Sequence, residues 1–105
     1  MAKEYKTSGT PALPPVHPGA VLREDVLPAS KMTVTGAAEA LGISRQLLHG
    51  ILREAKPVTP ETALRLGKLF GNGPTLWLRM QQEFDLWHAA RSLADDLKRI
   101  ETHAV

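Results

Sequence analysis

The chain has 105 residues, of which 43% are hydrophobic and 23% charged, a composition typical of one globular domain. It contains no cysteine, which excludes disulfides, thiolate metal sites and thiol catalysis. No apolar run approaches the ~20 residues that span a bilayer, and the first residues lack the apolar core of a secretory signal. We therefore expect a cytoplasmic protein with no membrane partner. Its net charge of +2 is by itself a weak argument for binding nucleic acid.

Residues 1–16 are predicted to form a flexible N-terminal arm, because prolines interrupt any periodicity and apolar residues are sparse. The folded part is expected to begin at residue 17, with Pro18 in the first turn of a helix. Apolar residues then fall on one side of this first helix, which we expect to stop at Pro28.

Two short helices joined by a glycine-containing turn are predicted next. The first covers residues 35–41, with Thr33 or Thr35 as its N-cap and Gly42 as the left-handed residue that follows it. The second covers residues 44–53, with Ser44 as its N-cap. The apolar residues of both helices would press on one core, and this arrangement is the helix-turn-helix layout.

A fourth helix is predicted to begin after Thr59, with proline at its first position, and to end before Gly71. A fifth begins at Pro74 and carries an apolar stripe with spacings of three, four and three residues. The stripe consists of Trp77, Met80, Phe84 and Trp87. We interpret it as core, with a partner surface as the alternative.

No segment shows the two-residue alternation of a strand, so the predicted fold class is all-α with five helices. The helix-turn-helix domain is expected at residues 17–91. Residues 92–105 would form a C-terminal helix extension or a tail.

The second helix of the predicted motif combines an apolar face with a polar one. Arg45 can bond guanine O6 and N7, and Gln46 can bond adenine N6 and N7. Residues at the start of a recognition helix reach deepest into the major groove. The predicted base contacts are Ser44, Arg45, Gln46 and His49.

Phosphate contacts position a protein on DNA and need cations or hydroxyl groups near the motif. The predicted phosphate contacts are Thr33, Thr35, Arg53 and Lys56. The alternative is an ordinary helix pair with a solvated polar face, in which Arg53 and Lys56 are surface charges. The four histidines lack metal-ligand spacing, and no nucleotide-binding or nucleophile motif occurs, so we expect no enzyme activity, metal or cofactor.

Four segments resemble a known family in the order in which they occur. They are "HPGAVLREDVLP", "GAAEALGISRQLLHGIL", "VTPETALRLGKLFG" and "PTLWLRMQQEFDLWHA". Together they resemble HigA-type antitoxins, a branch of the Cro/C1-like (XRE) superfamily that includes virulence-associated protein I and has a lambda-repressor-like fold. The resemblance covers roughly residues 17–91.

The resemblance implies a homodimer that binds double-stranded operator DNA, represses its own operon and neutralises a HigB/RelE-like mRNA interferase toxin. The family's DNA-reading face maps onto Ser44, Arg45, Gln46 and His49. The chain departs from the family at Ala20, where glutamate is usual, and at residues 53–56, "REAK", where an Asn-Gly-Lys turn is common. A stand-alone XRE-family repressor and a helix-turn-helix-derived protein-interaction module remain the alternatives.

Overall fold

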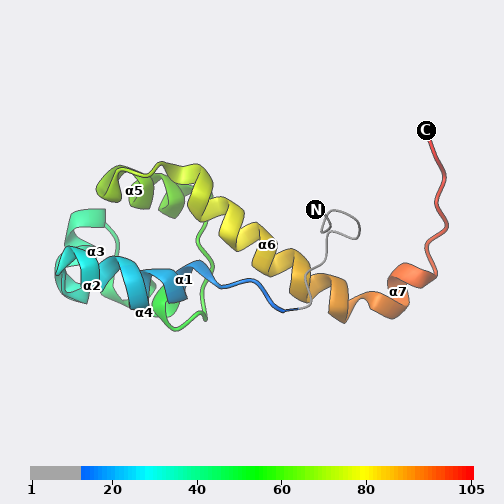
Figure 1. The fold of residues 1–105 in the computed structure, drawn as a ribbon, viewed down its shortest axis with the longest axis horizontal. Coiled ribbons are helices and arrows are strands. Elements are labelled where there is room, and N and C mark those ends of the chain that lie inside the picture. Colours follow the sequence, from blue (N-terminus) through cyan, green and yellow to red (C-terminus); the bar gives the residue numbers. More distant parts are fainter. Residues whose placement is uncertain (1–12) are drawn as a thin grey trace, which may run out of the picture.

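All regular secondary structure in residues 13–105, the part that the computed structural model describes, is helical (Figure 1). In chain order the elements are α1 (Pro18–Val21), η2 (Leu22–Val26), α2 (Leu27–Ser30), α3 (Val34–Leu41), α4 (Arg45–Leu52), α5 (Pro60–Phe70), α6 (Pro74–Ser92) and α7 (Ala94–Lys98). The all-α prediction is confirmed. The predicted count of five was slightly low. Elements α1, η2 and α2 together form the one helical segment predicted at the start, and the additional helix is α7, which follows α6. Most of the predicted arm lies outside the described residues.

The first helical segment does not stop at Pro28, so that prediction is wrong. Its middle part, η2, is a π-helix, in which the Leu27 N–H donates to the Leu22 carbonyl five residues earlier. Pro28 consequently lies in the first turn of α2, where the segment changes from π-helix to α-helix. The segment ends at Lys31, which has the left-handed φ of 59°.

The turn between α3 and α4 forms as predicted. Gly42 has a φ of 74° and donates to the Glu39 carbonyl at 3.1 Å, while the Ile43 N–H donates to the Ala38 carbonyl at 3.1 Å. These two bonds form a Schellman motif, which satisfies carbonyls at the end of α3. Ala38 is itself buried, as expected for a small residue where two helices meet.

The start of α1 packs directly on the end of α4. A Cβ atom built on Gly19 would lie 1.8 Å from the Ile51 carbonyl oxygen, so only glycine permits this approach. The buried His17 is the N-cap of α1, and its Nδ1 accepts from the Gly19 N–H at 2.9 Å. Burial lowers the pKa of His17, although the charges of Glu54 and Asp85 oppose the shift. The imidazole therefore stays neutral near pH 7 and keeps the lone pair that caps the helix.

Helices α5 and α6 close the other side of the core. Trp77 is fully buried, and its indole N–H donates to Asn72 Oδ1 at 3.1 Å, which confirms that this part of the aromatic stripe is core. The buried Gln81 accepts from the Val58 N–H at 2.8 Å and donates to Asp85 at 3.0 Å. This amide fixes the loop that leads from α4 to α5.

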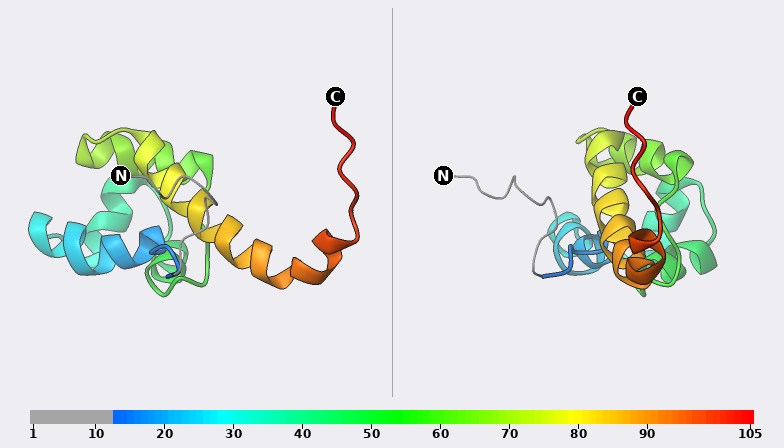
Figure 2. Two further views of the ribbon diagram at one scale, coloured as in Figure 1. Left: turned by 45° about the vertical axis from the view of Figure 1, so that its right-hand side comes forward. Right: turned by 90° about the vertical axis from the view of Figure 1, so that its right-hand side faces the viewer.

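The last part of the chain leaves the bundle. Beyond Gln81 no residue of α6 is buried, and α7 has no buried residue. In Figure 1 and in the left view of Figure 2 the end of α6 and α7 project away from α1–α5. The core is thus assembled from the elements between His17 and Gln81.

Replacement of Gly19 tests the contact between α1 and α4. The Gly19→Ala change is expected to destabilise the fold by at least about 2 kcal/mol, because a methyl group would overlap the Ile51 carbonyl. The matched control is Gly36→Ala, where the nearest atom, Thr33 Oγ1, lies at 3.1 Å and alanine favours the helix. Urea denaturation at one protein concentration should leave this control within about 1 kcal/mol of wild type. Equal stabilities for the two variants would contradict the described packing.

Candidate nucleic-acid interface

Helix α4 buries one face and exposes the other. Leu48, Ile51 and Leu52 are buried. The four predicted base-contacting residues, Ser44, Arg45, Gln46 and His49, are all exposed at its start and along its outer face. The Ser44 hydroxyl caps the helix by accepting from the Leu47 N–H at 3.0 Å. Its hydrogen remains available for donation to a ligand.

The predicted phosphate contacts are also exposed but come from three different places. Thr33 caps α3, its hydroxyl oxygen accepting from the Gly36 N–H at 3.0 Å, and Thr35 lies in the first turn of the same helix. Arg53 is the C-cap of α4. Lys56 lies in the loop beyond it. The prediction thus joins the start of α3 with the loop after α4.

The stem of Lys56 lies against α4. A Cβ atom on the buried Gly50 would come within 2.6 Å of Lys56 Cγ, and the Lys56 N–H donates to the Gly50 carbonyl at 3.0 Å. Glycine at position 50 therefore lets the loop fold back on the helix. The aliphatic part of Lys56 serves packing, while the ammonium group at its end is free to reach solvent or a ligand.

The turn after α4 lacks the Asn-Gly pair that is common in the family. Glu54 adopts a left-handed φ of 66°, a conformation that glycine or asparagine tolerates more easily. Its carboxylate is paired with Arg23 at 3.3 Å, and the same Arg23 Nη1 donates to the Leu52 carbonyl at 2.6 Å. Arg23, from the first helical segment, thus holds the end of α4 and the unusual turn together.

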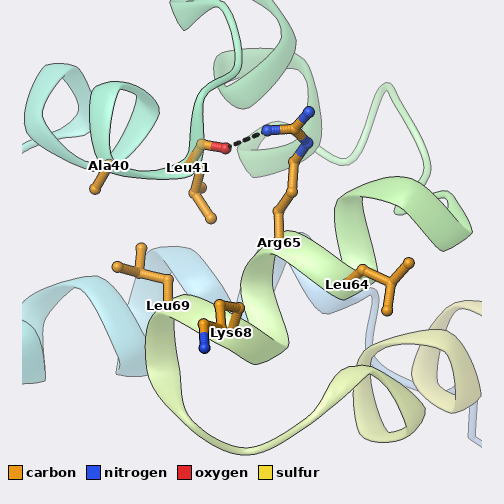
Figure 3. Close-up of a pocket in the computed structure, with 6 residues that line it drawn as sticks. All are labelled: Ala40, Leu41, Leu64, Arg65, Lys68 and Leu69. Atoms are coloured by element: carbon orange, nitrogen blue, oxygen red, sulfur yellow. Dashed lines mark hydrogen bonds between the residues drawn. The ribbon is translucent and has the colours of Figure 1, made fainter.

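A second arginine, Arg65, binds the end of α3. Arg65 of α5 donates through Nη1 to the Leu41 carbonyl at 2.8 Å (Figure 3). An ion pair with Glu61 at 3.2 Å orients its guanidinium group. Arg65 flanks a shallow groove of about 320 Å³ between α3 and α5, lined by Ala40, Leu41, Leu64, Arg65, Lys68 and Leu69. Arg65 therefore contributes to the structure of the motif.

Sequence reasoning missed both arginines. Each donates to a carbonyl more than twenty residues away in the chain, and a side chain at that separation leaves no local pattern. One local signal was the spacing of four residues between Glu61 and Arg65, typical of a helix ion pair. A glycine inside a predicted helix, Gly50, was a further signal of close packing.

Two features are absent from residues 13–105. No group of three His, Cys, Asp or Glu side chains in this range is arranged to hold a metal ion. None of the helices described is both long and apolar enough to cross a membrane.

Comparison with known proteins identifies the family. No protein-family model matches the chain. Virulence-associated protein I of Dichelobacter nodosus is 38% identical over 79 residues, which cover 75% of this chain and 73% of that protein. An addiction module antidote protein of the HigA family from Coxiella burnetii superimposes with a TM-score of 0.79 at 33% identity, over 88% of this chain and all of that one. The chain belongs to the HigA family of helix-turn-helix antitoxins.

A further structural relative of this HigA-family chain was solved on DNA. The antitoxin GraA in complex with its operator has a TM-score of 0.82 and 30% identity, over 91% of this chain and 98% of that one. Other relatives include an HTH-type transcriptional regulator of Escherichia coli and the antitoxin HigA-1 of Vibrio cholerae, which are 30% and 28% identical.

Proposed function

We propose that this chain is a sequence-specific DNA-binding antitoxin that uses α4 as its recognition helix. The single observation that carries the proposal is the exposed polar face at the capped start of α4, opposite a face that buries Leu48, Ile51 and Leu52 in the core. The operator-bound state of the similar antitoxin GraA supports the same use of the motif. Residues 17–91 would form the DNA-binding domain and residues 92–105 an extension of it.

Base readout is proposed for Ser44, Arg45, Gln46 and His49. Arg45 and Gln46 occupy the first turn of α4, the part of a recognition helix that reaches base edges. Guanidinium and carboxamide groups can each form two bonds with one purine. His49 lies one helical turn further along the same exposed side, where it would reach a neighbouring part of the groove.

Backbone contacts are proposed for Thr33, Thr35, Arg53 and Lys56. These residues lie at the start of α3 and at and beyond the end of α4, outside the predicted base-reading positions. Phosphate contacts there would fix the position of α4 in the groove. Lys56 and Arg53 would neutralise phosphates, so binding should weaken as the salt concentration rises. Two copies of the chain would bind a palindrome with half-sites one helical turn apart.

The biological role is proposed from the family. As a HigA-type antitoxin, the chain would neutralise a HigB/RelE-like mRNA interferase and repress the operon that encodes both proteins. A stand-alone repressor would keep the DNA-reading face but have no toxin partner. A protein-interaction module would bind DNA only weakly and without sequence preference.

Removal of the Arg45 guanidinium tests the DNA-reading face. Arg45→Ala is expected to lose ~1–3 kcal/mol of operator affinity and to relax specificity at one base pair, as measured by gel-shift titration with operator variants. The control Arg79→Ala removes the same charge from an exposed position on α6, outside α4 and the predicted phosphate contacts, and should bind like wild type. Operator affinity of Arg45→Ala equal to that of wild type would refute the base contact.

Co-purification tests the antitoxin role separately. Chain isolated from its native host is expected to bring down a small basic toxin, and Arg45→Ala should retain that partner because it alters only the DNA-facing side. Recovery of the chain with no toxin, together with intact operator binding, would favour the stand-alone repressor.

A further inference from the structure

An acidic residue lies in the middle of the turn that is proposed to contact phosphates. Glu54 directly follows Arg53 and precedes Lys56 by two residues. A negative charge at this place would repel the phosphate backbone, and it also lies at the negative end of the α4 dipole. The position of Glu54 is therefore electrostatically unfavourable for DNA binding unless another group compensates its charge.

The backbone of the turn fixes Glu54 at this position. The Glu54 N–H donates to the Ile51 carbonyl at 2.9 Å, and the Ala55 N–H donates to the Gly50 carbonyl at 2.9 Å. These two bonds form a Schellman motif at the end of α4, and Glu54 occupies its left-handed position, where glycine is the usual residue. A change of backbone that moved the carboxylate elsewhere would break both bonds.

Arg23 of the first helical segment binds both the end of α4 and the carboxylate of Glu54. Its Nη1 donates to the Leu52 carbonyl at 2.6 Å, a group that neither Schellman bond uses, and to Glu54 Oε2 at 3.3 Å. Its Nη2 is paired with Glu24 at 3.0 Å. The Glu54 side chain is 36% exposed and that of Glu24 is 65% exposed, so Glu54 is the more enclosed of the two acids. One guanidinium thus satisfies a carbonyl and compensates a carboxylate.

We propose that Arg23 is a positioning residue for operator binding, which compensates the charge of Glu54 and holds that carboxylate away from the phosphates. The proposal deepens, and rests on, the proposed function of α4 and the turn that follows it. Arg23 acts through Glu54 and needs no contact with DNA of its own. Without Arg23, a free carboxylate would lie beside Arg53 and Lys56 and lower the affinity of the turn for phosphates.

A double-mutant cycle on Arg23 and Glu54 tests the proposal by gel-shift titration of the full-length chain with operator duplex. At low salt, Arg23→Met is expected to weaken operator binding about tenfold, because a carboxylate close to the phosphates loses its compensating charge. The difference should shrink as the salt concentration rises. Adding Glu54→Gln to Arg23→Met should restore affinity to within about threefold of wild type. Loss of the Leu52 bond alone would be neither salt-dependent nor reversed by glutamine.

Glu54→Gln by itself gives a readout that leaves Arg23 in place. In this variant Arg23 still pairs with Glu24 and donates to the Leu52 carbonyl, so operator affinity is expected to stay within about threefold of wild type. A gain of about tenfold would show that Glu54 already repels phosphates in the wild type, and would overturn the inference.

The matched control is the pair Arg65 and Glu61, in which an arginine also donates to a carbonyl at a helix end and is paired with a glutamate. Glu61 belongs to α5 and lies outside the proposed phosphate contacts, so Glu61→Gln should not restore any affinity that Arg65→Met loses. Wild-type affinity of Arg23→Met, or a loss that Glu54→Gln does not reduce, would overturn the inference and leave the proposed function intact. A wild type that does not bind operator DNA would overturn both.

Discussion

The contact between the backbone of α1 and the end of α4 is the constraint on which the rest of the structure depends. Because Gly19 has no side chain, the Ile51 carbonyl can lie against it, and α4 is pinned along its inner side. Arg23, one turn further along the first segment, binds the next carbonyl of α4. With its back and its C-terminal end fixed in this way, α4 has only its first turn and outer face left to offer a ligand.

A hydrogen bond from an arginine to a carbonyl at a helix end occurs twice in the motif. The last carbonyls of a helix have no hydrogen-bond donor within the helix. Here Arg65 donates to a carbonyl at the end of α3, and Arg23 donates to a carbonyl at the end of α4. Each guanidinium is itself oriented by a glutamate, Glu61 or Glu54. A reading face needs fixed geometry more than it needs additional stability, and charged hydrogen bonds to carbonyls provide directional constraints that apolar packing does not.

The features that the sequence predicted well are those encoded by neighbouring residues. Ser44, Thr59 and Gly42 define helix ends through bonds to atoms within a few residues, so their types and positions were sufficient. The prediction that the first helix stops at Pro28 was wrong because the π-helix η2 places Pro28 in the first turn of α2. The rule that proline ends a helix takes no account of a π-helix before it. The arginine contacts were hidden for another reason, since they depend on the packing of helices that are distant in the chain.

The most direct test of the central claim, that α4 presents the DNA-reading face, is an NMR titration of the full-length chain with its operator duplex. Amide and side-chain signals of residues 44–49 are expected to shift most, with smaller changes at the start of α3 and in the loop around Lys56. Signals of buried residues such as Trp77 should stay nearly constant, because the fold holds α4 in place before DNA arrives. Shifts concentrated in α5 or α6, with the first turn of α4 unaffected, would contradict the account.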